Sequence, residues 1–192
     1  MILNIPNNLT LLRIAMIPCL ILVFYISDNI LSLYQKNLIA TLIFLLAAIT
    51  DWLDGYLARK LNQTSNFGAF IDPVADKLIV IAALILLVQL NRIDSIIAFI
   101  IIAREFTISS LREWMATLGK SGSIAVAFVG KLKTTMQMIA ILFLLYYENI
   151  LFIPIALIGK ILIYIAALLT IISMIYYLKI AFKILKEKKG LL

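Results

Sequence analysis

Four aspartates at the boundary between two apolar runs are the residues best suited to chemistry in this sequence. They fall within 26 residues of one another, at Asp51, Asp54, Asp72 and Asp76. At 100° per residue of α-helix, Asp51 and Asp54 share one face of a first helix. Asp72 and Asp76 are four residues apart and share one face of the next helix. Two adjacent antiparallel helices would therefore direct four carboxylates at one cavity.

Such a cluster predicts a site for divalent cations. Neighbouring carboxylates repel one another unless a cation neutralises them or some are protonated. Oxygen ligands suit Mg²⁺ or Mn²⁺, and two such ions beside a diphosphate are a recurring arrangement for displacement at phosphorus. Gly55, Ala58 and Gly68 lack bulky side chains, so a nucleotide and its phosphates can approach the backbone, and Arg59 offers a partner for a phosphate. Helix packing through small residues is the alternative reading, and it leaves the aspartates unexplained.

The composition restricts the class of protein. The chain has 192 residues, of which 64% are hydrophobic and 14% charged, and its mean hydropathy is +1.10. A soluble domain is about half apolar and about a quarter charged, so we expect an all-α, polytopic integral membrane protein with a single domain over residues 1–192. Histidine is absent and Cys19 is the one cysteine, which excludes serine–histidine triads and multi-cysteine zinc sites. The +7 charge is interpreted as a basic rim facing anionic lipid and not as a nucleic-acid surface.

Six apolar runs predict six membrane spans. They cover Leu9–Ile26, Leu38–Leu57, Ile71–Leu90, Ile96–Leu118, Val129–Tyr147 and Leu151–Leu178. Placing the N-terminus in the cytoplasm puts fourteen of the 17 basic residues at the inner face, so we expect both termini to be cytoplasmic. The acidic cluster then faces the cytoplasm, and the expected location is the inner or plasma membrane of a bacterium.

The acidic segment also resembles a known family. The pattern Asp51-x-x-Asp54-Gly55-x-x-Ala58-Arg59-x8-Gly68-x3-Asp72-x3-Asp76 matches all eight specified positions of the signature of the CDP-alcohol phosphotransferases. Further segments resemble the bacterial members that form phosphatidylglycerophosphate. These segments are Asn4-Ile5-Pro6-Asn7-Asn8-Leu9-Thr10-Leu11-Leu12-Arg13, Ala103-Arg104-Glu105, Leu111-Arg112-Glu113-Trp114 and Gly130-Lys131-Leu132-Lys133-Thr134-Thr135. The resemblance covers most of residues 4–135.

The resemblance implies a reaction and a set of roles. The reaction is transfer of the phosphatidyl group of CDP-diacylglycerol to the 1-hydroxyl of glycerol 3-phosphate, with release of CMP, in a protein that is commonly a homodimer. Asp51, Asp54 and Asp72 would be ligands of two Mg²⁺ or Mn²⁺ ions. Asp76 would touch the second ion and act as the general base for the acceptor hydroxyl. Gly55, Ala58, Arg59 and Gly68 would hold the cytidine diphosphate.

The signature does not identify the acceptor, because family members with different acceptors share it. Four cations near predicted cytoplasmic helix ends would form a dianion pocket if those ends converge: Arg104, Arg112, Lys131 and Lys133. A phosphorylated acceptor needs such a pocket and free serine does not. Alternatively, these cations only follow the positive-inside rule, with Glu105 and Glu113 balancing the arginines. Inositol phosphate, phosphatidylglycerol and serine stay open as acceptors.

Two further alternatives concern the N-terminus and the class of protein. Asn8, Thr10 and Arg13 either contribute to the nucleotide site or belong to a capped helix start at the membrane interface. A divalent-cation transporter would also use buried aspartates. It would need acidic residues toward both membrane faces, whereas this cluster lies at one end only.

Overall fold

The computed structural model describes residues 4–60, 65–117 and 128–189, without the side chains of residues 5, 55, 58, 59, 128–132 and 183–189. The residues that it describes form helices and no strand, which confirms the all-α prediction for this part of the chain. The elements are α1 (Ile5–Leu22), η1 (Val23–Tyr25), α2 (Leu33–Lys60), α3 (Asn66–Gln89), α4 (Ser95–Thr117), α5 (Phe128–Tyr146) and α6 (Ile155–Lys189).

Each predicted apolar run coincides with most of one α-helix, and the first run extends beyond α1 into η1. Several helices begin before their runs because polar residues cap them. The side chain of Asn4 accepts a hydrogen bond from the Asn7 amide at 2.9 Å and starts α1. Ser32 and Gln35 start α2 with a reciprocal pair, in which the Gln35 side chain accepts from the Ser32 amide at 2.9 Å and the Ser32 hydroxyl accepts from the Gln35 amide at 3.4 Å. Hydropathy does not register such capping pairs.

The last helix begins later than its run and ends well after it. Residues 150–153 form a turn in which the Ile150 and Ile153 backbones exchange two hydrogen bonds. Pro154 follows, and α6 starts at Ile155. Proline suits the start of a helix because it has no amide hydrogen to leave unpaired. α6 then continues past Leu178 to Lys189, as the length of the run suggested.

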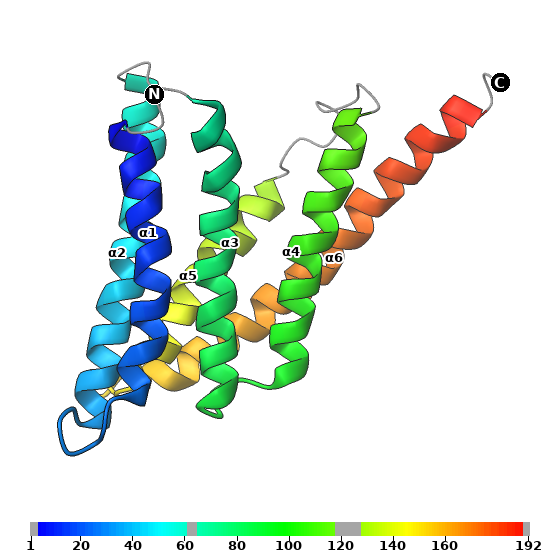
Figure 1. Ribbon diagram of the computed structural model, residues 1–192. Coiled ribbons are helices and arrows are strands. Elements are labelled where there is room, and N and C mark those ends of the chain that lie inside the picture. The colour runs from blue at the N-terminus through cyan, green and yellow to red at the C-terminus, as the bar shows by residue number, and fades with distance from the viewer. Residues whose placement is uncertain (1–3, 61–64, 118–127, 190–192) are drawn as a thin grey trace. The chain divides into compact units, whose positions relative to one another are not determined.

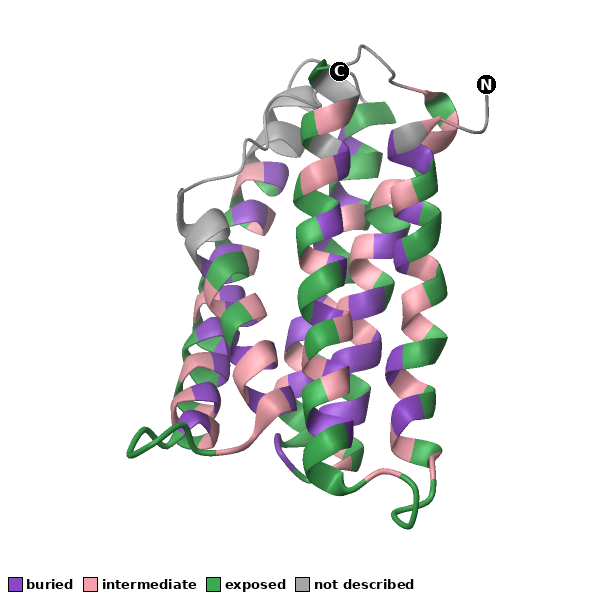
Figure 2. Ribbon diagram, turned by 90° about the vertical axis from the view of Figure 1, so that its left-hand side faces the viewer, coloured by how far each residue is buried: buried purple, intermediate pink, exposed green. Residues whose placement is uncertain are grey.

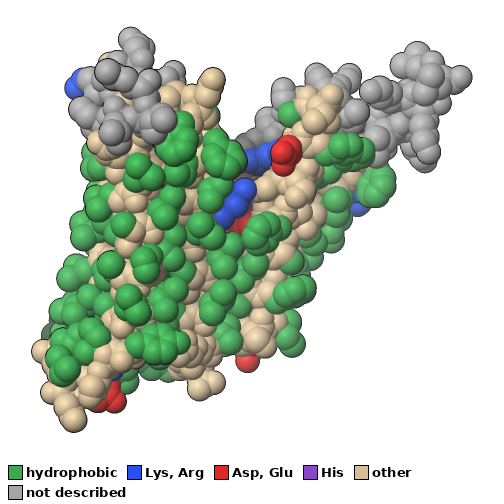
Figure 3. Space-filling model, in the orientation of Figure 1, with side chains coloured by type: hydrophobic (Ala, Val, Ile, Leu, Met, Phe, Trp, Pro, Cys, Tyr) green, Lys and Arg blue, Asp and Glu red, His purple; other side chains and the backbone are tan. Residues whose placement is uncertain are grey.

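Three helices of the described chain are long and apolar enough to cross a membrane. These segments are Pro6–Tyr25, Leu33–Asp54 and Ile155–Phe182. The apolar sequence of α3 is interrupted by charged residues at Asp72, Asp76 and Lys77, and α4 also carries charged residues. These two helices are therefore not among the three segments. Hydrophobic side chains cover the visible surfaces of the helices in Figure 3. The chain is therefore a helical membrane protein by the length and composition of these segments.

The chain divides into two compact units. The first unit comprises residues 1–92 and 141–159, and the second comprises residues 93–140 and 160–192. In the first unit, α1 packs against both α2 and α3 (Figure 1). Small buried side chains permit close approach of helices in lipid, and this unit buries Ala40, Ala47, Ala75 and Ala83 almost completely. Buried residues recur along each helix among exposed ones (Figure 2).

The second unit has a core between α4 and α6. Tyr177 and Ala181 of α6 pack with a set of apolar residues on α4: Ile108, Leu111 and Met115. Outside this core, the Tyr164 hydroxyl donates a hydrogen bond to Asp94. The α4 segment that carries Arg104 and Glu105 is thus continuous with a packed helix pair.

A buried arginine holds one end of the first unit together. Arg92 follows α3 and is 3% exposed. Its guanidinium donates to the carbonyls of Leu144 and Leu145, both at 2.8 Å, near the end of α5. It also donates to the Asn37 side chain at 2.6 Å and lies 4.4 Å from the centre of the Tyr147 ring. Helix C-termini leave carbonyls unpaired, and Arg92 satisfies two of them.

Candidate functional site

One buried face of α1 carries polar residues, although most of the helix is apolar. Asn7, Thr10 and Arg13 recur at every third position and are 2%, 3% and 0% exposed. Because α1 packs against α2 and α3, this face is buried within the first unit. Polar groups are costly at membrane depth unless they find partners, so this face requires polar groups on the neighbouring helices.

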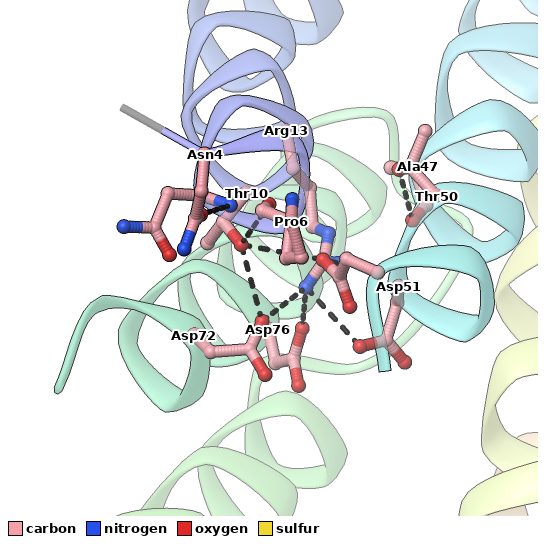
Figure 4. Close-up of polar contacts among 11 residues, drawn as sticks. Asn4, Pro6, Thr10, Arg13, Ala47, Thr50, Asp51, Asp72 and Asp76 are labelled. Atoms are coloured by element: carbon pink, nitrogen blue, oxygen red, sulfur yellow. Dashed lines mark hydrogen bonds and ion pairs between the residues drawn. The ribbon is translucent and has the colours of Figure 1, made fainter. Parts of the chain in front are cut away.

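The four aspartates provide those partners. Arg13 lies among them and forms ion pairs with all four carboxylates (Figure 4). Its Nη1 is 3.2 Å from Asp51 Oδ1 and 3.5 Å from Asp72 Oδ1, and it also contacts Asp76 Oδ1. Its Nη2 is 2.5 Å from Asp54 Oδ2. Three helices therefore meet at one guanidinium.

The carboxylates differ in depth. The Asp54 side chain is 4% exposed, whereas those of Asp51, Asp72 and Asp76 are 49%, 40% and 42% exposed. The Thr10 hydroxyl lies 3.3 Å from Asp54 and 3.5 Å from Asp72. The buried part of the site thus consists of Asp54, Thr10 and Arg13. The other three carboxylates are partly exposed.

The three shallower carboxylates converge closely enough to share a cation. One oxygen from each of Asp51, Asp72 and Asp76 lies within 4.8 Å of the others. An oxygen-only donor set with partly exposed carboxylates is what Mg²⁺ and Mn²⁺ require, because these ions keep some water or substrate ligands. The residues present therefore fit a divalent metal ion.

The first turn of α3 is fixed against α1 at Gly68. The Ser65 hydroxyl caps α3 by accepting from the Gly68 amide at 2.9 Å, and the Asn7 side chain donates to the same hydroxyl at 3.0 Å. A Cβ at position 68 would lie 2.5 Å from Asn7 Oδ1, closer than atoms normally approach. The close packing of α1 on α3 is one reason for a glycine here, in addition to any role in nucleotide binding.

Other predicted nucleotide residues are only partly described. The backbones of Gly55, Ala58 and Arg59 belong to α2, but their side chains lie outside the described residues. Asn8 is exposed. Sequence reasoning selected Asn8 and missed Asn7, although Asn7, Thr10 and Arg13 share the three-residue spacing of one helix face.

The predicted acceptor cations lie in the second unit, and two of them share a carboxylate. Glu105 Oε1 is 2.9 Å from Arg104 Nη1 and 2.6 Å from Lys133 Nζ. Arg104 and Lys133 are both buried, and Arg104 Nε has no hydrogen-bond partner among the described residues. Arg112 is exposed, and the side chain of Lys131 lies outside the described residues. The expected ion pair between Arg104 and Glu105 is therefore present, and Lys133 pairs with the same carboxylate.

Comparison with known proteins decides the family. The family model for CDP-alcohol phosphatidyltransferases matches residues 3–175. This chain belongs to that family. The resemblance found in the aspartate pattern is thereby confirmed, and members of this family depend in general on divalent metal ions.

Bacterial CDP-alcohol phosphatidyltransferases resemble this chain over nearly its whole length. The protein of Haemophilus influenzae is 52% identical over 93% of each chain. That of Wigglesworthia glossinidia brevipalpis is 47% identical over 94% of this chain and 96% of its own length. That of Escherichia coli K12 is 48% identical over 93% and 94%, respectively. Each is named a CDP-diacylglycerol–glycerol-3-phosphate 3-phosphatidyltransferase.

Proposed function

We propose that this CDP-alcohol phosphatidyltransferase transfers the phosphatidyl group of CDP-diacylglycerol to the 1-hydroxyl of sn-glycerol 3-phosphate. The products are phosphatidylglycerophosphate and CMP. The observation that carries the proposal is the convergence of Asp51, Asp72 and Asp76 within 4.8 Å in a chain 47–52% identical to relatives named for this reaction.

The carboxylates would hold two divalent ions, Mg²⁺ or Mn²⁺. Asp51, Asp54 and Asp72 are the proposed ligands, and Asp76 would touch the second ion. Such ions, when bound, neutralise a diphosphate and stabilise the departing CMP. The buried position of Asp54 suits a ligand that binds the ion away from solvent. The partial exposure of the other three carboxylates suits contact with substrate.

Asp76 is the proposed general base. Its carboxylate would accept the proton of the acceptor 1-hydroxyl while that oxygen forms a bond to the β-phosphorus of CDP-diacylglycerol. The bond between the β-phosphorus and the bridging oxygen breaks at the same time, and CMP leaves with the electron pair. The 42% exposure of the Asp76 side chain supports its access to a substrate hydroxyl.

The cytidine diphosphate would lie beside the first unit's glycines. Gly55, Ala58, Arg59 and Gly68 are its proposed contacts. Small residues allow the backbone to approach the phosphates, and an arginine pairs with them. Thr10 already contacts two of the aspartates, so its proposed role is to orient those carboxylates.

The acceptor phosphate would bind in the second unit. Arg104, Arg112, Lys131 and Lys133 are the proposed contacts. The single carboxylate of Glu105 contacts two of these cations, so the pair keeps a net positive charge. The Nε of Arg104, which has no partner in the described part of the chain, offers a buried donor for a phosphate oxygen, and this supports a phosphorylated acceptor over free serine.

The membrane arrangement follows from the same proposal. The chain would form one domain over residues 1–192 with six spans, both termini in the cytoplasm and the aspartates facing the cytoplasm. It would work as a homodimer in the inner membrane of a bacterium. CDP-diacylglycerol would keep its acyl chains in the surrounding lipid, where hydrophobic side chains cover the helices.

Release of CMP by the purified protein tests this function. Full-length protein in detergent receives CDP-diacylglycerol and Mg²⁺ with glycerol 3-phosphate, inositol phosphate, serine or phosphatidylglycerol in separate reactions. We expect release with glycerol 3-phosphate alone and its loss in Asp76→Asn. Release with another acceptor would overturn the acceptor and keep the family. Absence of release from folded protein, together with cation flux in liposomes, would favour a transporter.

A further inference from the structure

Arg13 is placed where a divalent cation would also find its ligands. Its guanidinium is fully buried and contacts oxygens of Asp51, Asp72 and Asp76. These are the three residues whose carboxylate oxygens lie within 4.8 Å of one another. Its second terminal nitrogen binds the deeper Asp54. The arginine therefore approaches the proposed metal-binding side chains from the α1 side (Figure 4).

The charges of this cluster do not cancel. When all four carboxylates are ionised, the single guanidinium leaves a net charge of about −3, which favours a further cation. Without Arg13, the four carboxylates would face one another with no positive charge among the described residues that contact them. Without the carboxylates, the fully buried guanidinium of Arg13 would lose the partners that compensate its charge, which is strongly unfavourable. The helix α1 is thus held to α2 and α3 by an ion-pair cluster that is still short of positive charge.

A guanidinium and a metal ion on the same carboxylates oppose each other. A carboxylate oxygen has lone pairs for two partners, so both cations can be bound together. Two like charges a few ångströms apart nevertheless repel, and the repulsion is large in a medium of low polarity. The metal must therefore bind against the field of Arg13.

We propose that Arg13 is the resident counter-cation of the carboxylate cluster. It keeps Asp51, Asp54, Asp72 and Asp76 together when no divalent ion is bound, and it weakens the binding of the ion that arrives. The site is thereby assembled before metal binds, and its ions stay exchangeable. Arg13 is a positioning residue that acts through the aspartates. This inference rests on the proposed function only in taking the aspartates as metal ligands.

The test compares metal binding and stability in three variants of the full chain. Arg13→Gln removes the charge, and Arg13→Lys keeps it. Arg92→Gln is the matched control, because Arg92 is also a buried arginine of the first unit but contacts carbonyls, an amide and a ring. Mn²⁺ binding is measured by electron paramagnetic resonance, and thermal unfolding is measured in EDTA and in Mn²⁺.

We expect Arg13→Gln to bind Mn²⁺ about tenfold more tightly than the wild type, because the opposing charge is gone. Its unfolding temperature should fall in EDTA and recover in Mn²⁺. Arg13→Lys should bind Mn²⁺ within about twofold of the wild type, because it retains the charge. Arg92→Gln should lose stability equally in EDTA and in Mn²⁺.

Several results would overturn the inference. Equal or weaker Mn²⁺ binding by folded Arg13→Gln would show that Arg13 does not oppose the ion. Failure of Arg13→Gln to fold in Mn²⁺ as well as in EDTA would show that the ion cannot replace the arginine. Both results leave the proposed function standing if the wild type binds Mn²⁺ and releases CMP. No Mn²⁺ binding and no CMP release by the wild type would instead contradict the proposed function.

Discussion

Arg13 and Arg92 are two buried arginines at opposite ends of α2 and α3 in the first unit, and their partners differ in kind. Arg92 donates to two carbonyls and one side-chain amide oxygen and lies over a tyrosine ring. Arg13 contacts four carboxylates. The Arg92 end is satisfied by neutral partners, whereas the Arg13 end keeps a surplus of negative charge.

This difference indicates a structural role for Arg92 and a metal-binding role for the residues around Arg13. The donors of Arg92 are taken up by acceptors of the folded chain, so this arginine links the end of α5 to α2. Four carboxylates that share one guanidinium still favour divalent cations, and such cations are what a displacement at a diphosphate requires. The reaction is therefore expected at the Arg13 end, and the Arg92 end is expected to contribute to stability alone.

The largest expected effect contrasts an aspartate from each end. Asp51→Asn removes a proposed metal ligand, and we expect the rate of CMP release to fall about 10³-fold. Asp28→Asn is the control, because Asp28 is an exposed partner of Lys36 at 2.6 Å near the Arg92 end. Its rate should match that of the wild type. Equal losses in the two variants would remove the distinction between the ends.

The next effect concerns stability at the Arg92 end. Arg92→Met leaves three buried acceptors without their donor, which should lower the free energy of unfolding by about 3 kcal/mol. Thermal unfolding in detergent measures this loss. The rate of CMP release per folded molecule, measured well below the unfolding temperature, should not change. A lower rate per folded molecule would show that the Arg92 end takes part in the reaction.

A smaller effect compares one glycine from each end. Gly68→Ala would displace the Asn7 side chain and weaken the hydrogen bond between Asn7 and Ser65. We expect the free energy of unfolding to fall by about 1 kcal/mol. Alanine at Gly159 would lie 3.0 Å from carbons of Leu144 and Phe143 and cost about 2 kcal/mol by overpacking. Asn7→Ala should abolish the cost at Gly68 and leave that at Gly159 unchanged. A double-mutant cycle in thermal unfolding checks this.

The smallest effect is an expected absence of pH dependence. Burial lowers the pKa of Arg92 to about 10, well below the ordinary range of an arginine, against the raising influence of Tyr147 and Glu148. As the pH rises, Arg92 therefore loses its proton in the folded state at a lower pH than in the unfolded state. The free energy of unfolding increases from this effect only above about pH 10. Below this range both states are protonated. The difference in stability between the wild type and Arg92→Met should stay constant from about pH 6 to about pH 9.

The sequence alone could predict what depends on spacing and composition. The apolar runs predicted the helices, and the aspartate pattern predicted a family that the comparisons confirm. Capping residues such as Asn4 and Ser65 shifted the helix starts because their effect is local hydrogen bonding and not hydropathy. Three of the six predicted spans are found among the described residues. Charges interrupt α3 and α4, and the apolar segment described for α5, Lys133–Tyr146, is shorter than a span.

The arrangement around Arg13 could not be predicted in the same way. The spacing of the aspartates places them on two helices but gives no position for α1. Only the packing of α1 against both α2 and α3 directs Arg13 to all four carboxylates and makes Asp54 deeper than the others. The interaction of Asn7 with Ser65, 58 residues away, depends on the same packing.

The most direct test of the account is the conversion of radiolabelled glycerol 3-phosphate by purified wild-type protein supplied with CDP-diacylglycerol. The reaction is run in EDTA and then again after excess Mn²⁺ is added. We predict no labelled lipid in EDTA, and labelled phosphatidylglycerophosphate in an amount equal to the CMP released once Mn²⁺ is present. Labelled lipid formed at the same rate in EDTA, or none formed under either condition by folded protein, would contradict the proposal that the four aspartates form a metal-dependent transferase site.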